Sequence, residues 1–253
     1  MLQSQLQSIV EKFAVSATVS TIRPLGSGLI NDTYLVVMEE KDQPDYVLQR
    51  INHEVFPDID MVMRNIAIVT RHIRERLIAQ GETDLHHHVL EFLPTVEDAC
   101  RLYAEVDGHY WRLMVFIDHA VTKQEVNPES AHAAGQSFGH FQAMLADVPC
   151  QLGETIKDFH NMEFRIEQLK QACVEDRAGR FDEPVVQELL EQLGKRAEAM
   201  TEAERLGREG KLPKRVCHCD TKVNNMLFSE DGSEVLCVID LDTCLLYTSP
   251  SPR

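Results

Sequence analysis

The spacing of apolar residues changes near residue 118, and this change limits the folds that the chain can adopt. Before it, short apolar runs bounded by Gly, Asn, Asp or Pro predict strands, and apolar residues at helical spacing predict two helices. The predicted strands are 17–25, 33–39, 46–51, 89–93, 99–105 and 110–117, and the predicted helices are 4–15 and 60–79. We therefore expect a sheet-rich first part.

Beyond residue 118, helical spacing dominates and strands return only near the end of the chain. The predicted helices are 128–145, 161–173 and 183–209, and the predicted strands are 215–217, 225–228 and 235–239. Together the two patterns predict an α+β fold, with a sheet-rich part followed by a mainly helical part. A chain of 253 residues is long enough for two such lobes with real cores.

Composition and charge exclude several classes of protein. The chain is 43% hydrophobic and 26% charged, as in ordinary globular proteins, and its net charge of −16 argues against a nucleic-acid surface. It has no apolar run near the roughly 18–20 residues that span a bilayer, and no signal peptide is visible. Seven irregularly spaced cysteines do not suggest a disulfide framework. We expect a cytoplasmic protein that binds neither nucleic acid nor membrane; its oligomeric state stays open.

The strongest chemical signal is a set of polar residues around two short apolar strands near the end of the chain. Asp220 is followed five residues later by Asn225, and Asp240 follows the apolar residues of the next strand. Phosphoryl transfer from a magnesium nucleotide needs such a set, because one carboxylate orients the attacking hydroxyl while an Asn and a second Asp hold metal between the phosphates. The alternative is a polar turn between strands with carboxylates at their ends by chance.

Three further residues belong to the same stretch. We expect His218 to brace the loop through hydrogen bonds and Lys222 to stabilise charge on the transferred phosphoryl group. Asp242 is either a further metal ligand or an acid that supports one.

A glycine-containing segment lies between two predicted strands, with Gly26, Ser27, Gly28, Asn31 and Thr33 within nine residues. Glycine permits positive φ and close backbone approach, so the amides of such a hairpin could cover phosphates. The same residue types also form ordinary hairpin turns, so both interpretations stay open. The segment is not a Walker A loop, because no Gly-Lys-Ser/Thr follows.

The strand at 46–51 carries a basic residue that could reach the nucleotide phosphates. Arg50 is the candidate, and the alternative is an arginine on the solvent face of an edge strand. Gln49 is a competing assignment, because one step of register exchanges the two faces of a strand.

Two groups of metal-ligand residue types are expected to be incidental. The side chains of His86, His87 and His88 are consecutive and are not expected to converge, so a solvated loop is the interpretation we favour. Cys217 and Cys219 flank His218, but no second pair follows at the spacing of a zinc site.

The chain resembles the aminoglycoside phosphotransferase and choline kinase superfamily, which shares a protein-kinase-like fold. The family's His-x-Asp-x-x-x-x-Asn loop matches His218, Asp220 and Asn225, and its metal-binding Ile-Asp matches Ile239 and Asp240. The details at 47–52, 55–58 and 218–225 look most like the N-acetylhexosamine kinase branch. The resemblance to the superfamily covers nearly the whole chain.

The resemblance implies ATP and Mg²⁺ as cofactors and a sugar as the small-molecule substrate, phosphorylated on its anomeric hydroxyl. It places the adenine against a hinge at Phe116 and Ile117, an N-lobe at 1–117 and a C-lobe at 118–244. Such a C-lobe normally continues beyond the Ile-Asp strand, so we expect an incomplete C-lobe. We also expect residues 245–253 to be a non-native tail, with a natural disordered tail as the alternative.

The predicted function is therefore transfer of the ATP γ-phosphoryl group to a hydroxyl of an N-acetylhexosamine, although a truncated chain could itself be inactive. Two alternatives remain. One is a nucleotide-binding pseudokinase or regulatory module. The other is a kinase of the same fold for an amino alcohol, homoserine or an aminoglycoside.

Overall fold

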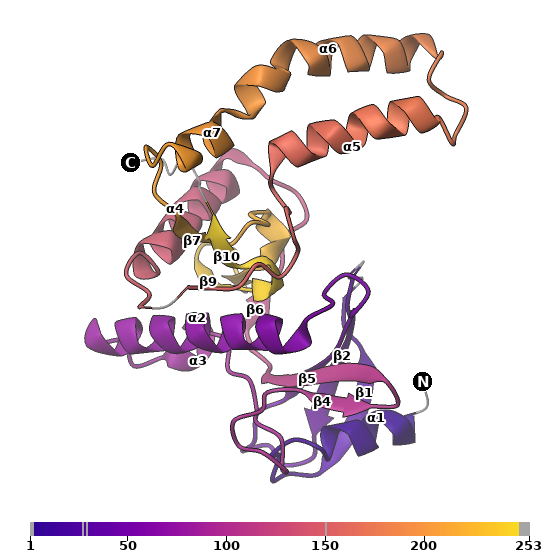
Figure 1. Ribbon diagram of the computed structural model, residues 1–253. Helices are drawn as coiled ribbons and strands as arrows, with labels where there is room; N and C mark the ends of the chain where they lie inside the picture. The colour runs from indigo at the N-terminus through magenta and orange to yellow at the C-terminus, as the bar shows by residue number, and fades with distance from the viewer. Residues whose placement is uncertain (1–2, 27, 29, 150, 248–253) are drawn as a thin grey trace.

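The computed structural model describes residues 3–26, 28, 30–149 and 151–247. Its first part is built on a five-stranded antiparallel sheet with the strand order β1-β2-β3-β5-β4 (Figure 1). The strands are β1 (Val19–Pro24), β2 (Asp32–Met38), β3 (Tyr46–Ile51), β4 (Ala104–Val106) and β5 (His109–Val115). β3 lies at the centre of the sheet, and its residues are all buried or half-buried, as expected for a central strand.

The sheet has two differently covered faces. One face packs against α1 (Gln3–Val10) and includes Leu48 and Trp111, which are almost completely buried. The other face, which includes Val47, packs against α2 (Ile59–Ala79). Because successive side chains of a strand point to opposite faces, neighbouring residues of β3 and β5 enter different cores.

Helix α2 crosses between the sheet and the rest of the molecule (Figure 1). Asp58 caps its first turn by accepting a hydrogen bond of 2.9 Å from the amide of Met61, and Gly81 follows its end with φ of 85°. The helix buries an apolar stripe at helical spacing, and this stripe forms the main core together with residues of the second part. The members of the stripe are Val62, Ile66, Val69, Ile73 and Leu77.

The second part combines helices with two small sheets. Its strands are β6 (Ala120–Val121), β7 (Arg215–Cys217), β8 (Met226–Ser229), β9 (Val235–Val238) and β10 (Leu245–Tyr247), paired as β6-β8-β9 and β10-β7. Its helices are α4 (Pro128–Met144), α5 (Met162–Glu175), α6 (Pro184–Met200) and α7 (Glu202–Arg208). No residue of α5, α6 or α7 is fully buried, and α5 and α6 lie far from the five-stranded sheet (Figure 1).

Several predicted elements need correction. Residues 89–93 form no strand and contribute only an isolated bridge between Phe92 and Met114, while a short helix, α3 (Leu85–His88), was not predicted. The single helix predicted at 183–209 is two helices, α6 and α7, which meet at Thr201. Across the described residues, none of the helices combines the length and the apolar character needed to cross a membrane.

The tail that we expected to be non-native begins with ordered structure. β10 pairs with β7, and Leu245 is only 2% exposed. Tyr247 donates a hydrogen bond of 2.8 Å to the carbonyl of His160. The expected boundary at residue 244 therefore lies directly before a packed strand, and residues 248–253 lie outside the described residues.

Candidate functional site

The pairing of β8 with β9 brings two of the predicted residues together. Met226 lies opposite Val238 in the register, so the residues next to them, Asn225 and Ile239, also meet. The amide of Ile239 donates a hydrogen bond of 2.9 Å to the carbonyl of Asn225. Asp240 follows directly, and the sheet therefore holds it beside Asn225.

Asp220 lies in the loop between β7 and the short 3-10 helix Val223–Asn225. The Asn225 side-chain amide donates to both the backbone carbonyl and the carboxylate Oδ2 of Asp220, each at 2.9 Å. The ammonium group of Lys222 lies 2.7 Å from the same carboxylate oxygen. The structure thus brings together three residues that the spacing of the motif singled out.

His218 lies beneath this loop, completely buried against the rings of Phe138 and Phe141. Its Nδ1 accepts from the amide of Asp220 at 3.3 Å, which leaves Nε2–H to donate to the carbonyl of Ile239 at 2.8 Å. Burial lowers the pKa of His218, so the neutral ring suits this pattern. His218 therefore connects the two loops that carry Asp220 and Asp240, which is the geometry expected of a brace.

Asp240 has the backbone and charge environment of a functional position. It adopts a left-handed conformation with φ of 61°, which is uncommon for a residue other than glycine. Burial, followed by the negative charge of Asp242, raises its pKa to about 6. Asp220 adds to this charge, so the loops concentrate carboxylates in a partly desolvated place.

These groups fit a hard divalent cation. Mg²⁺ takes oxygen ligands, and the residues that could supply them are Asp240 and, through its amide oxygen, Asn225. Besides these oxygen ligands, the excess of negative charge around Asp240 also favours a cation there.

Asp242 makes contacts that the sequence did not suggest. It is 1% exposed, and the guanidinium of Arg112 on β5 binds it through two nitrogens, with Nη2 to Oδ2 at 3.0 Å. The side-chain amide of Asn31 donates to the same Oδ2 at 2.9 Å. Both carboxylate oxygens of Asp242 are therefore bound by groups of the first part of the chain, which agrees with a supporting acid better than with a metal ligand.

The loop of Asp242 is also fixed to the second part. The hydroxyl of Thr243 donates to the carbonyl of His218 at 2.8 Å, and the hydroxyl of Thr155 donates to the carbonyl of Asp242 at 2.8 Å. Residues 240–243 are thus held from two sides.

The register of β3 decides between Gln49 and Arg50. Gln49 lies opposite Arg112 and accepts a hydrogen bond of 2.9 Å from its Nε, so these two side chains share the face of Asp242. Arg50 lies opposite Trp111 on the other face, where it pairs with Asp32 at the surface. Arg50 is therefore directed away from Asp242, contrary to the expected role of a phosphate-binding cation.

Arg112 is the residue that sequence reasoning missed. It is 3% exposed, shares the face of Gln49, and its positive charge acts to lower the pKa of Asp240. The only signal in the sequence is a basic residue within an apolar strand, and its partner is 130 residues away. No local spacing connects the two.

The glycine segment connects β1 with β2, and two of its side chains make contacts within the protein. Gly26 has φ of 72°, and a Cβ on Gly28 would come within 3.2 Å of the carbonyl of Asn31. The side chain of Asn31 is directed inward to Asp242, and that of Thr33 accepts from Gln49 at 2.9 Å. Ser27, also predicted here, lies outside the described residues.

The predicted hinge follows β5. The amide of Phe116 donates to the carbonyl of Asp45 at 2.9 Å, and Ile117 is 5% exposed within the main core. The amide of Phe116 is thus already engaged within the protein.

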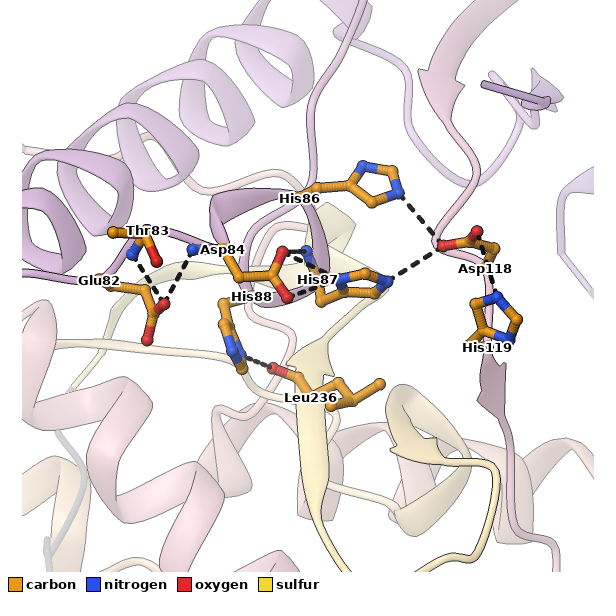
Figure 2. A network of polar contacts seen from close by, with 9 residues as sticks. All are labelled: Glu82, Thr83, Asp84, His86, His87, His88, Asp118, His119 and Leu236. Atoms are coloured by element: carbon orange, nitrogen blue, oxygen red, sulfur yellow. Dashed lines mark hydrogen bonds and ion pairs between the residues drawn. The ribbon is translucent and has the colours of Figure 1, made fainter. Parts of the chain in front are cut away.

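The two groups set aside as incidental differ in outcome. Burial raises the pKa of Cys219 to about 12, which keeps this thiol uncharged. His86 and His87, by contrast, both reach Asp118 (Figure 2). The expectation that consecutive histidines do not converge was wrong here, because a third residue from another segment lies within reach of both.

Two hollows of about 620 and 430 Å³ lie elsewhere in the molecule, the first along α2 and the second between α2, α4 and β9. Neither is lined by Asp220, Asn225 or Asp240. The candidate site is therefore defined by its converging polar groups and not by either hollow.

Solved structures of kinase-like proteins share this fold. Spectinomycin phosphotransferase in complex with ADP and spectinomycin has a TM-score of 0.59 and 15% identity, over 97% of this chain and 70% of that chain. Amicoumacin kinase in complex with AMP-PNP and Ca²⁺ has a TM-score of 0.59 and 11% identity, over 97% and 65%. An aminoglycoside phosphotransferase from Alicyclobacillus acidocaldarius has a TM-score of 0.57 and 17% identity, over 96% and 67%.

At these identities the likeness establishes the fold, and it confirms the predicted kinase-like α+β architecture. Residues 21–248 in addition match the phosphotransferase enzyme family, which confirms the predicted superfamily and enzyme class. The chain belongs to the phosphotransferase enzyme family.

Proposed function

We propose that this chain is a small-molecule kinase that transfers the γ-phosphoryl group of ATP to a hydroxyl of its acceptor. The observation that carries the proposal is the contact of Asn225 and Lys222 with one oxygen of Asp220, beside Asp240. Phosphoryl transfer depends mainly on positioning and charge stabilisation, and this arrangement supplies both.

In the proposed mechanism Asp220 orients the acceptor hydroxyl and accepts its proton. Its Oδ2 is held by Asn225 and Lys222, so Oδ1 is the oxygen that we assign to the substrate. Lys222 then stabilises the charge that develops on the transferred group. His218 keeps the two loops in register through its bonds to Asp220 and Ile239.

We assign Mg²⁺ to Asn225 and Asp240. When bound, this ion neutralises charge on the phosphates. Asp242 is assigned to fixing the loop of Asp240 through its pairing with Arg112, and not to the ligands. The backbone of the segment Gly26–Gly28 is assigned to the phosphates, and the residues around Phe116 and Ile117 to the adenine.

For the acceptor we propose an N-acetylhexosamine attacked at its anomeric hydroxyl. The support is the resemblance at 47–52, 55–58 and 218–225. Aminoglycoside and aminopropanol kinases of the same fold make a cationic acceptor the competing choice.

One observation favours a second candidate, a nucleotide-binding module without catalysis. Arg50 is directed away from the loop of Asp240, and Arg112 is already paired with Asp242. With neither of these two arginines on the phosphates, the site would bind nucleotide without transferring its phosphoryl group.

The test replaces Asp220 by Asn in the chain as it stands. We expect turnover to fall by about two to four orders of magnitude, as for loss of a general base, while ATP binding persists. Asp182→Asn, at an exposed position near the start of α6, is the matched control and should keep full turnover. Turnover retained in Asp220→Asn would contradict the assignment of Asp220 as the residue that accepts the proton.

The acceptor is tested with labelled ATP and a panel of N-acetylhexosamines, amino alcohols and aminoglycosides. Transfer to N-acetylhexosamines supports the proposed substrate, and transfer to amines alone replaces it with a cationic acceptor. ATP binding without transfer to any acceptor would favour the non-catalytic module.

A further inference from the structure

A cluster of three metal-ligand side chains lies outside the candidate phosphotransfer site. His86 and His87 belong to α3, and Asp118 follows the last strand of the five-stranded sheet. Nε2 of His87 lies 3.0 Å and Nε2 of His86 lies 3.5 Å from the same Oδ1 of Asp118 (Figure 2). His88 takes no part, because its Nδ1 is directed to the carbonyl of Leu236 at 3.0 Å.

The hydrogen bonds of His87 define which nitrogen is available. Its Nδ1 lies 2.7 Å from the carboxylate of Asp84, which acts as acceptor. In the neutral ring the Nδ1 proton is donated to Asp84, and Nε2 then presents a lone pair towards Asp118. A lone pair facing a carboxylate oxygen is repulsive unless a second proton or a cation lies between them.

The distances suit a cation. Zinc binds histidine nitrogen and carboxylate oxygen at about 2.0–2.2 Å, and tetrahedral ligands then lie about 3.3–3.5 Å apart. The separation of 3.5 Å between His86 and Asp118 lies at the upper end of this range, and the separation of 3.0 Å between His87 and Asp118 lies just below it. All three ligand atoms lie within 4.8 Å of one another, so small side-chain movements would complete the geometry.

We propose that His86, His87 and Asp118 form a zinc-binding site. Two imidazoles and one carboxylate supply three ligands, and water completes the fourth position. Asp84 holds the ring of His87 from behind, as carboxylates do for metal-bound histidines. The site links α3 to the segment after β5, two segments 31 residues apart in the chain.

This inference is independent of the proposed phosphotransfer, because it shares no residue with Asp220, Asn225 or Asp240. The test therefore measures zinc binding alone. Protein freed of metal by a chelator is titrated with Zn²⁺ in a calorimeter, and the thermal midpoint is recorded with and without the ion. We expect one equivalent to bind and the midpoint to rise.

The double variant H86A/H87A should lose at least 100-fold in affinity, and D84N should lose about 10- to 100-fold through misplacement of the ring. His132→Ala removes an exposed histidine of α4 and should bind as the unmodified chain does. Circular dichroism confirms that each variant folds. The proposal is overturned if the unmodified protein binds no zinc, or if H86A/H87A binds it equally well.

Discussion

The two faces of the five-stranded sheet each carry an arginine paired with an aspartate, yet the pairs differ in every other respect. Arg112 and Asp242 are 3% and 1% exposed and join segments 130 residues apart. Arg50 and Asp32 are 37% and 50% exposed and lie opposite each other on adjacent strands. The first pair borders the candidate site, and the second faces solvent.

The difference teaches that burial decides what an ion pair does. An exposed pair gains little, because water and salt screen it and two side chains lose freedom. A buried pair adds little net stability over apolar residues, but each partner becomes indispensable once the other is present. Arg112 is therefore important because Asp242 is buried beside it, and Arg50 has no such dependence.

Replacing Arg112 by Met should have the largest effect on stability. Asp242 would lose its partner in a desolvated place, and we expect a loss of about 3–5 kcal/mol in the free energy of unfolding. Urea unfolding followed by circular dichroism measures it. The double variant R112M/D242L removes both charges and should recover most of the loss; equal instability of the two variants would show that charge pairing is not the cause.

Removing the side chain of Asn31 should have an intermediate effect. This side chain donates to Asp242 and accepts from the amide of Asn52 at 3.0 Å, so N31A removes one of the hydrogen bonds of Asp242 and takes the side-chain acceptor away from the amide of Asn52. We expect a loss of about 1–3 kcal/mol in urea unfolding. N52A, which keeps its backbone amide bonded to Asn31, is the matched control and should lose less.

Acid should lower the free energy of unfolding, because His218 is buried in the folded protein. Burial lowers its folded pKa, so the native state binds fewer protons than the unfolded chain below about pH 6.5. This contribution is present above the unfolded pKa and is lost as the pH falls. It adds at most about 1.4 kcal/mol per pH unit to the slope between neutral pH and pH 5. A slope as steep in H218Q as in the unmodified protein would contradict this.

The exposed pair should give the smallest effect. Arg50→Met removes a half-exposed partner of Asp32, and we expect a change below about 1 kcal/mol in the free energy of unfolding. Because salt screens such pairs, the change should shrink further at high ionic strength. A loss as large as that of R112M would remove the contrast between the two faces.

Elements with long, regular apolar patterns could be predicted from the sequence. β3 has the predicted bounds, and α2 begins within one residue of the predicted start. α3 has only four residues, which is too short for a helical period to show. β10 at Leu245–Tyr247 is stabilised by its pairing with β7, a contact between distant segments that local spacing does not reveal.

The same distinction holds for the candidate site. Asp220 and Asn225 lie five residues apart, so their spacing alone predicted that they would meet. Arg112, Asn31 and Asp242 meet only because the five-stranded sheet packs against the loop after β9. For Arg50, one step of strand register separated the predicted role from the observed position.

The two-sided attachment of residues 240–243 has a consequence for motion. Asp242 is bound to the sheet by Arg112 and Asn31, while Thr243 is bound to the carbonyl of His218. Rotation of the sheet away from the second part would have to break one set of these bonds. These bonds therefore oppose separation of the sheet from the second part. The backbone of residues 240–243 should also be less mobile than that of α5 and α6, which bury no residue.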